Sequence, residues 1–220
     1  MSRLKTPVSF FKSITETKRP VVKDLQSFLI SVSDFDNYDE SLRLNYVEDK
    51  SNYDKLKKRL PGIVFGAFSE RKDTACIEYS PCMGFDIDGI KDYNSVLGIL
   101  DQIKKIDYVF AAFPSVSGHG IRILVFTSAE LKTHKNYYTS IAKSLEHELE
   151  LGSANIDHST KNVSRLWYYS VVQKNEMYLN ENSAAYEIET VEKNDSKSKS
   201  IGSNTIVLMM IKSILQLQKF

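Results

Sequence analysis

The chain has 220 residues, of which 42% are hydrophobic and 26% charged, and this composition is ordinary for a globular protein. Its length accommodates one large domain, or one domain with an appendage. The formal net charge of +1 excludes a strongly polycationic protein that coats duplex DNA, because that mode of binding needs a clear basic excess. A basic groove on a nearly neutral surface remains compatible with this charge.

Two features of the sequence bear on its compartment. Cys76 and Cys82 form neither a CxxC pair nor a Cys/His metal pattern, which predicts two free thiols in a reducing compartment. Met1 to Lys12 mixes charged and aromatic residues without the apolar run of a secretory leader. We therefore expect a cytoplasmic protein with no membrane partner.

The first 60 residues are predicted to be mainly helical. Apolar residues recur at helix-like spacing at Val21, Val22, Leu25, Phe28 and Leu29. The pair of acids in Asp34-Phe35-Asp36 lies in a polar setting that is typical of a loop or cap. A later helix carrying Tyr53, Leu56 and Leu60 is expected to stop at Pro61-Gly62.

The central part of the chain predicts an α+β core. Residues 63–68 and 74–79 are expected to form two strands around a polar turn. Then follow a strand at 84–88, a helix at 92–105, strands at 108–113 and 121–127, a helix capped by Ser128 and ended by Gly152, and a strand at 165–171. This order predicts an RRM-like β-α-β-β-α-β palm, an antiparallel sheet with both helices on one face. The unbroken apolar run at 108–113 indicates a strand buried on both faces. The face opposite the helices is nevertheless expected to be open to a polymer or nucleotide.

The composition changes near the end of the chain. Residues 191–204 are rich in Lys, Ser and Asn and predict a flexible linker. Residues 205–220 are expected to begin a helical segment, since Ile206 to Leu217 is too short for a membrane span and is interrupted by Lys212. We therefore predict a catalytic domain at 1–190, composed of an extension at 1–80 and a palm-like core at 81–172.

The central motif is Phe85-Asp86-Ile87-Asp88. In a strand, successive side chains alternate between faces, so Asp86 and Asp88 project from one face and Phe85 and Ile87 from the other. Two carboxylates so placed repel each other unless a positive charge lies between them. A divalent metal carrying nucleotide phosphates is the usual partner for such a pair.

In the predicted topology, two further segments meet the acid pair at one edge of the open face. One is the turn Ser117-Gly118-His119-Gly120, and the other is Asn155-Ile156-Asp157. A third carboxylate completes an oxygen-rich cage for two Mg2+ or Mn2+ ions, which activate an attacking hydroxyl and hold a leaving pyrophosphate. The sequence therefore predicts metal binding by Asp86, Asp88 and Asp157.

The turn and two arginines offer contacts to a triphosphate. The glycines, Gly118 among them, allow backbone amides to approach phosphates closely. Ser117 can donate a hydrogen bond, and His119 can offer an imidazole N–H without a full charge. Arg122 and Arg165 can supply bidentate phosphate contacts.

This order of motifs resembles the archaeo-eukaryotic primase superfamily, the primase-polymerases. The resemblance lies in Phe85-Asp86-Ile87-Asp88, Ser117-Gly118-His119 and Ile156-Asp157. The context, with 56–61, 66–68 and Arg71-Lys72, is similar to the VirE N-terminal-like branch of mobile-element helicase-primases and CRISPR-associated primase-polymerases. The resemblance implies a nucleotidyltransferase that acts in DNA replication on nucleoside triphosphates and a single-stranded DNA template or primer, with a helicase or CRISPR-associated module as a further partner.

The resemblance leaves gaps, and two other functions stay open. No Cys/His zinc cluster of the kind found in many cellular primases is present in the sequence. A rolling-circle or relaxase-type nuclease would use Tyr137 or Tyr138 as its nucleophile. A single-strand-binding module of RNA-recognition type would stack bases on aromatic side chains of the open sheet.

Overall fold

A computed structural model describes residues 2–33, 41–151 and 154–188. Contacts within the chain divide it into two units, Met1–Ile188 and Glu189–Phe220, and the fold described below is that of the first unit. The predicted linker at 191–204, the segment at 205–220, the Asp34–Asp36 loop and Gly152 lie outside the described residues. In the described ranges, no helix has both the length and the apolarity needed to cross a membrane.

The first of two antiparallel sheets is built from the N-terminal part of the chain and one late strand. Its order is β2-β1-β3-β4, and β9 pairs with the start of β3. The strands are β1 (Pro7–Phe11), β2 (Val21–Asp24), β3 (Gly62–Phe68), β4 (Cys76–Tyr79) and β9 (Trp167–Tyr168). The predicted hairpin at 63–79 is therefore confirmed as β3 and β4.

The prediction of a mainly helical N-terminus is only partly right. The helices there are α1 (Leu25–Val32), α2 (Ser41–Glu48) and α3 (Lys50–Lys57). Val21 and Val22 belong to strand β2 instead, as β-branched residues favour. Helix α1 begins only after Asp24, whose carboxylate accepts a hydrogen bond from the Ser27 backbone N–H at 2.9 Å.

The second sheet follows the predicted β-α-β-β-α-β order of elements. Its strands run β10-β6-β7-β5-β8 across the sheet, and all adjacent pairs are antiparallel. The elements are β5 (Cys82–Asp88), α4 (Tyr93–Ile103), β6 (Val109–Pro114), β7 (Ile121–Phe126), α5 (His134–Glu148), β8 (Asn155–Ile156) and β10 (Tyr178–Leu179). Short 3-10 helices lie at η1 (Arg3–Lys5), η3 (Asp73–Ala75), η4 (His158–Lys161) and η5 (Lys174–Glu176).

Two details of the predicted core are wrong. The strand that follows α5 in the second sheet is Asn155–Ile156, whereas Trp167–Tyr168, expected there, pairs with Gly62 and Ile63 in the first sheet. Ser128 does not cap α5, which begins at His134. The Ser128 hydroxyl instead hydrogen-bonds to Tyr137 and Glu187.

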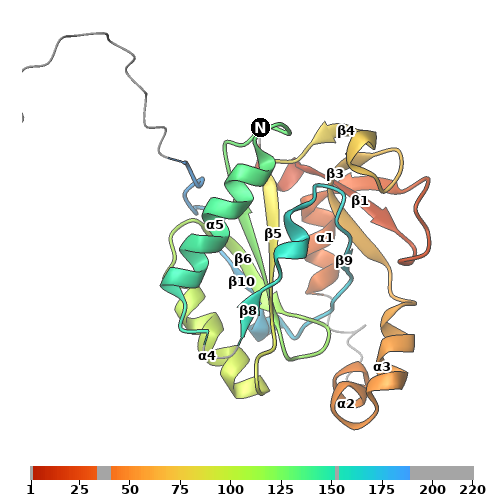
Figure 1. The fold of residues 1–220 in the computed structure, drawn as a ribbon, viewed down its shortest axis with the longest axis vertical. Helices are drawn as coiled ribbons and strands as arrows, with labels where there is room; N and C mark the ends of the chain where they lie inside the picture. The colour runs from red at the N-terminus through yellow and green to blue at the C-terminus, as the bar shows by residue number, and fades with distance from the viewer. Residues whose placement is uncertain (1, 34–40, 152–153, 189–220) are drawn as a thin grey trace, which may run out of the picture. The chain divides into compact units, whose positions relative to one another are not determined.

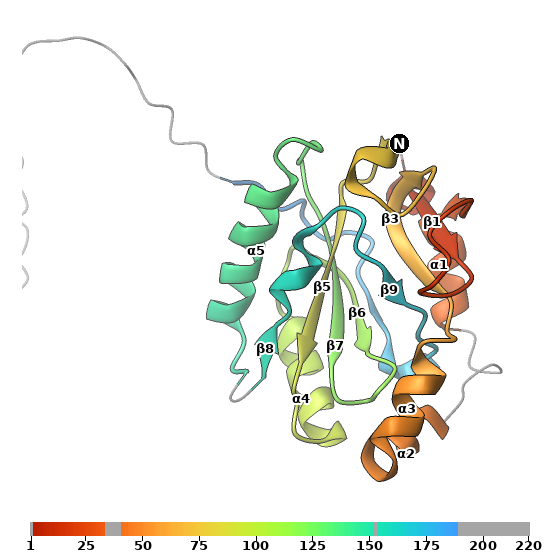
Figure 2. The ribbon, with the colours of Figure 1, turned by 45° about the vertical axis from the view of Figure 1, so that its right-hand side comes forward.

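Helices α4 and α5 both pack on one face of the second sheet, as predicted (Figures 1 and 2). Each contributes an apolar stripe to a common core. From the helices these residues are Val96, Ile99, Leu100, Ile103, Tyr138, Ile141, Ala142 and Leu145, and from the strands Met83, Phe85, Ile87, Ile121, Ile123 and Val125. Burial of these side chains is the main source of stability for this face.

The opposite face is covered, which corrects the prediction of an open sheet. The first sheet and α1 pack against it, forming a second core that joins the two sheets (Figure 2). This core includes Phe28 of α1, Ile63 of β3, Phe113 of β6, Leu124 of β7 and Trp167 of β9. Strand β6 is consequently buried on both faces, as its unbroken apolar run predicts.

Gly84 allows the two sheets to approach each other. A Cβ atom at this position would lie 2.2 Å from Cζ2 of Trp167 and 2.7 Å from Cε2 of Phe65. Both neighbours are rigid rings within the interface, so a side chain at residue 84 would force the sheets apart.

We therefore expect Gly84→Ala to lower the free energy of unfolding by about 1–3 kcal/mol through overpacking. Gly98→Ala is the matched control, because nothing lies within 4 Å of a Cβ there and the position is inside helix α4. The control should be neutral or stabilising by up to about 1 kcal/mol. Urea denaturation of both variants provides the comparison, and equal stabilities would contradict this account of Gly84.

Candidate functional site

A row of charged side chains crosses the second sheet where β5 ends. Arg122 on β7 is the register partner of Asp86 on β5. On the other side of β5, the pairing of Ile87 with Ile156 brings Asp157 opposite Asp86, and the Asp157 N–H donates to the Asp86 carbonyl at 2.8 Å. Paired residues of antiparallel strands share a face, so Arg122, Asp86 and Asp157 project from the same side of the sheet. Asp88, two residues after Asp86, shares that face.

Asp86 is a largely buried carboxylate whose negative charge is only partly balanced by its neighbours. Its side chain is 19% exposed, and Oδ1 lies 3.4 Å from Nε of Arg122. Both of these atoms are buried and make no hydrogen bond within the described residues. Burial raises the pKa of Asp86 to about 6, Arg122 opposes this shift, and Asp88 and Asp157 add to it. The site therefore favours an additional positive charge next to Asp86.

The three carboxylates suit a divalent cation in chemistry, but they do not form a closed cage. Carboxylate oxygens are the ligands that Mg2+ and Mn2+ prefer, and Asp86 Oδ1 has no competing hydrogen bond. Asp157, however, accepts hydrogen bonds from the Ser159 N–H at 2.8 Å and the Ser159 hydroxyl at 2.7 Å. Among the described residues, no three Asp, Glu, His or Cys side chains are close enough together to hold an ion as they stand. Metal binding by Asp86, Asp88 and Asp157 therefore requires side-chain rearrangement, chiefly at Asp157.

The turn between β6 and β7 is ordered by its own hydrogen bonds. The Ser117 hydroxyl accepts from the His119 N–H at 3.1 Å and hydrogen-bonds to the Ser115 hydroxyl at 3.0 Å. Gly118 has a φ of +71°, a left-handed conformation that favours glycine. Gly118 packs against the Arg43 side chain and does not line the pocket that contains Asp86. With Ser117 and His119 it lines a separate hollow of about 240 Å3.

His119 is held by two contacts that fix its hydrogen-bonding roles. Its ring stacks on Tyr46, with centroids 4.7 Å apart, and its Nδ1 lies 3.0 Å from the Ile90 carbonyl. A carbonyl only accepts, so Nδ1 carries the proton of this hydrogen bond, and Nε2 of the neutral ring is left as an acceptor. Donation from Nε2 to a phosphate therefore requires the imidazolium form, in contrast to the neutral donor expected from the sequence.

The two predicted arginines differ in availability. Arg122 is 5% exposed, donates to the Tyr168 carbonyl, and lies 5.3 Å above the Trp167 ring in addition to its pairing with Asp86. The guanidinium of Arg122 is thus largely occupied by contacts within the protein. Arg165 is 49% exposed, and its Nη2 is 3.8 Å from Oδ2 of Asp157. Arg165 is therefore the better placed of the two to contact a phosphate.

All of the predicted site residues except Gly118 line one pocket of about 370 Å3. The structure thus brings together three segments that are distant in the sequence. These residues are Asp86, Asp88, Ser117, His119, Arg122, Asp157 and Arg165.

The sequence analysis missed the opposite wall of this pocket, which comes from α2 and α3. Lys50 Nζ lies 4.1 Å from the ring centre of Tyr46 and 4.4 Å from that of Tyr53, and Lys57 Nζ lies 4.9 Å from that of Tyr168. Burial, with a further contribution from Arg122, lowers the pKa of Lys57. The spacing of Lys50, Tyr53 and Lys57 on α3 was the available signal, since it puts all three on one helical face. We refer to Tyr46, Lys50, Tyr53, Lys57 and Tyr168 as the Lys/Tyr wall.

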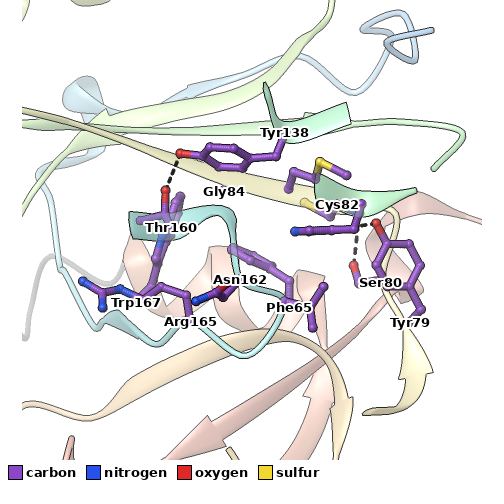
Figure 3. A pocket seen from close by; sticks show the side chains of 13 residues that line it. Phe65, Tyr79, Ser80, Cys82, Gly84, Tyr138, Thr160, Asn162, Arg165 and Trp167 are labelled. Atoms are coloured by element: carbon purple, nitrogen blue, oxygen red, sulfur yellow. Dashed lines mark hydrogen bonds between the residues drawn. The ribbon is translucent and has the colours of Figure 1, made fainter. Parts of the chain in front are cut away.

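Behind the row of acids, Tyr138 anchors the loop that carries Asp157. The buried Tyr138 hydroxyl donates to the Asp157 carbonyl at 3.0 Å. It also lies 2.6 Å from the Thr160 hydroxyl, to which it is hydrogen-bonded (Figure 3). Its ring stacks on Phe85 of β5, with centroids 4.7 Å apart. Tyr138 thus links helix α5, strand β5 and the Asp157 loop.

The fold and the pocket define a class: an α+β protein of two packed antiparallel sheets whose polar pocket sets three carboxylates against a wall of lysines and tyrosines. The family model of the BT4734-like N-terminal domain matches residues 55–171, more than half of the chain, and the protein belongs to this family. No curated protein and no solved structure matches the chain. The matched span contains every predicted site residue and Lys57, whereas Tyr46, Lys50 and Tyr53 precede it.

The raised pKa of Asp86 predicts a pH dependence of stability in the absence of divalent cations. A folded-state pKa of about 6, above the ordinary 3.8, means that the folded protein binds the proton more tightly than the unfolded chain. The resulting stabilisation is complete below about pH 4 and is lost as the pH rises through about 6. Relative to Asp86→Asn, the wild-type free energy of unfolding should fall on the order of 2–3 kcal/mol across this window.

Urea denaturation in EDTA at several pH values measures this difference. Asp101→Asn is the control, because Asp101 is an exposed residue of α4 that pairs with Lys104. The wild type and the control variant should lose stability together. A difference between wild type and Asp86→Asn that does not change with pH would rule out a raised pKa at Asp86.

Proposed function

We propose that this protein is a template-directed nucleotidyltransferase of the primase-polymerase type. The observation that carries the proposal is the single pocket in which Asp86, Asp88 and Asp157 meet the Ser117–His119 turn and Arg165. Carboxylates and cationic side chains in one hollow suit a substrate that brings both phosphates and a divalent metal.

The sheet order supports the same proposal. Within the second sheet, β8-β5-β7-β6 with both helices on one face is the order expected of an RRM-like palm. The acids lie at the end of β5 and directly after β8, the two adjacent strands of that order. This arrangement is consistent with the resemblance to the archaeo-eukaryotic primase superfamily, in which the same motifs surround the metals and the triphosphate.

In the proposed reaction, the 3′ hydroxyl oxygen of a strand bonds to the α-phosphorus of a nucleoside triphosphate, the bond to the β-phosphate breaks, and pyrophosphate leaves. When bound by Asp86, Asp88 and Asp157, Mg2+ or Mn2+ would lower the pKa of the attacking hydroxyl and neutralise the leaving group. Lys50 and Lys57 of the Lys/Tyr wall, and Arg165 beside Asp157, neutralise phosphate charge in the pocket. Positioning and charge neutralisation suffice for this chemistry, and no protein nucleophile takes part.

The two alternative functions have less support. Tyr138, a candidate nucleophile for a relaxase-type nuclease, is 1% exposed and faces away from the carboxylate pocket, and Tyr137 is hydrogen-bonded to Ser128. A module of RNA-recognition type needs accessible aromatic rings on its sheet. Here that face is covered by the first sheet, with Phe113 and Trp167 buried between the two.

The first test is template-directed incorporation of nucleotides in the presence of Mn2+ or Mg2+. We expect Asp86→Asn combined with Asp88→Asn to lower the rate at least about 100-fold, because the charges that hold the metal are lost. Asp101→Asn, which removes an exposed carboxylate of α4, should retain wild-type activity. Equal activity of the double variant and the wild type would refute the proposed function.

The contacts of His119 predict its part in triphosphate binding. Because Nδ1 is committed to the Ile90 carbonyl, Nε2 is the ring nitrogen that remains for a phosphate. His119→Asn should therefore lower the affinity for a nucleoside triphosphate and Mn2+ by about tenfold, through loss of one hydrogen bond to a charged group.

Calorimetric titrations of the wild type and His119→Asn measure the two affinities. The Asn amide retains a donor for Ile90, so the turn should stay intact. Equal affinities would exclude His119 from triphosphate binding.

A further inference from the structure

A second hollow of about 320 Å3 adjoins the carboxylate pocket. The two share Arg165, Leu166 and Tyr168, so they meet at the segment that leads into β9. The second hollow is otherwise lined by Ile14, Arg71, Asn162 and Ser164. Its polar lining thus consists of two guanidinium groups, a carboxamide and hydroxyls, with no carboxylate. We call it the arginine groove.

Arg71 provides the strongest indication of a ligand in this groove. Its Nη1 is buried and makes no hydrogen bond within the described part of the chain. Its backbone is fixed in the turn between β3 and β4, where its N–H donates to the Thr17 carbonyl at 2.7 Å. A buried donor on a cationic side chain is costly unless a partner binds it. Since Arg71 also lines the groove, a rotation of its guanidinium would present this donor to an anion bound there.

Asp73, an acid two residues after Arg71 in the sequence, does not supply this partner. Asp73 accepts hydrogen bonds from the backbone N–H and the hydroxyl of Ser164. This contact fixes the segment before Arg165 against the β3–β4 turn. It therefore holds the two arginine-bearing segments side by side, each contributing to the groove.

We propose that the arginine groove binds a backbone phosphate of a single-stranded nucleic acid whose neighbouring nucleotide occupies the carboxylate pocket. This inference rests on the proposed function and extends it to the path of the strand. Planar guanidinium groups suit phosphate oxygens, and two of them line this groove. The half-buried ring of Tyr168 lies between the two hollows, where a base or sugar of the strand would pass.

A strand fits this arrangement better than a free nucleotide. The triphosphate and its metal belong to the hollow that contains Asp86, Asp88 and Asp157, and no carboxylate lines the arginine groove. Two adjoining phosphate sites separated by an aromatic ring match the repeat of a polynucleotide backbone, in which phosphates alternate with sugars and bases.

The test compares Arg71→Gln with Lys72→Gln. Lys72 is the next residue, carries the same charge, is exposed, and does not line the groove, so it controls for long-range electrostatics. Fluorescence anisotropy in EDTA measures the affinity for a labelled oligothymidylate of about 20 nucleotides, which exceeds the usual site size of a single-strand groove. The measurements are repeated at several salt concentrations. Calorimetry with a nucleoside triphosphate and Mn2+ separately measures the carboxylate pocket.

Loss of one phosphate contact reduces the slope of log K against log salt by about 0.7, which corresponds to about a fivefold loss of affinity at about 0.1 M salt. We expect this change for Arg71→Gln, a smaller one for Lys72→Gln, and unchanged triphosphate affinity for both. Arg71→Lys keeps the positive charge but loses the planar group that can bind phosphate through two hydrogen bonds. It should retain most of the slope of log K against log salt. Thermal denaturation verifies that the variants fold, and Arg71 Nη1 has no hydrogen bond to lose on substitution.

Three outcomes would overturn the proposal. The first is the same oligonucleotide affinity and salt slope for Arg71→Gln and Lys72→Gln. The second is a loss of triphosphate affinity in Arg71→Gln that is as large as its loss of oligonucleotide affinity. The third is failure of the wild type to bind the oligonucleotide. None of these measurements depends on catalysis. If the protein binds the strand through Arg71 but incorporates no nucleotide, the proposed function is refuted and the inference about the arginine groove stands. If the protein incorporates nucleotides but Arg71→Gln does not change strand binding, the inference about the groove is refuted and the proposed function stands.

Discussion

The burial of Asp86 beside Arg122 is the constraint on which the site and the packing of the two sheets both depend. Removing a carboxylate from water costs several kcal/mol, and a single arginine 3.4 Å away offsets only part of this cost, since the pKa of Asp86 remains raised to about 6. Arg122 is in turn fixed by the Tyr168 carbonyl and the Trp167 ring, which belong to β9 of the other sheet. The contact between the sheets therefore sets the position of the arginine, and the arginine stabilises the charged form of the carboxylate against the effect of burial.

The local parts of the fold were predictable because local patterns determine them. Alternation along β5 correctly places Asp86 and Asp88 on one face, and apolar periodicity correctly gives the β-α-β-β-α order from β5 to α5. The fourth strand was not predictable in this way. Asn155–Ile156 is too short to show a pattern, whereas the aromatic segment at Trp167 has the composition of a strand and pairs with another sheet. Pairing over such distances depends on tertiary contacts that a local window does not contain.

The covering of the second sheet could have been predicted from the sequence. An unbroken apolar run at 108–113 predicts burial on both faces, and this is incompatible with an open sheet. The Lys/Tyr wall was missed for a different reason. Lysines on a helix usually belong to a solvated surface, and an aromatic residue beside them, such as Tyr53, usually belongs to the core. Only the placement of α3 beside the carboxylate pocket distinguishes Lys57 from an ordinary surface lysine.

Covering the sheet changes how a polyanion can approach the acids. Across an open face, Asp86, Asp88 and Asp157 would repel a phosphate backbone along its whole length. In this fold the acids are confined to one wall of a pocket, and cationic groups line the routes into it: Lys50 and Lys57 on one side, Arg165 on the other. In the proposed function, phosphates would be attracted to the walls, and the carboxylates would act only on the group that reaches the end of β5. The first sheet, which covers the surface expected to be open, is therefore also what would make the three acids a selective site for the proposed phosphate-bearing substrate.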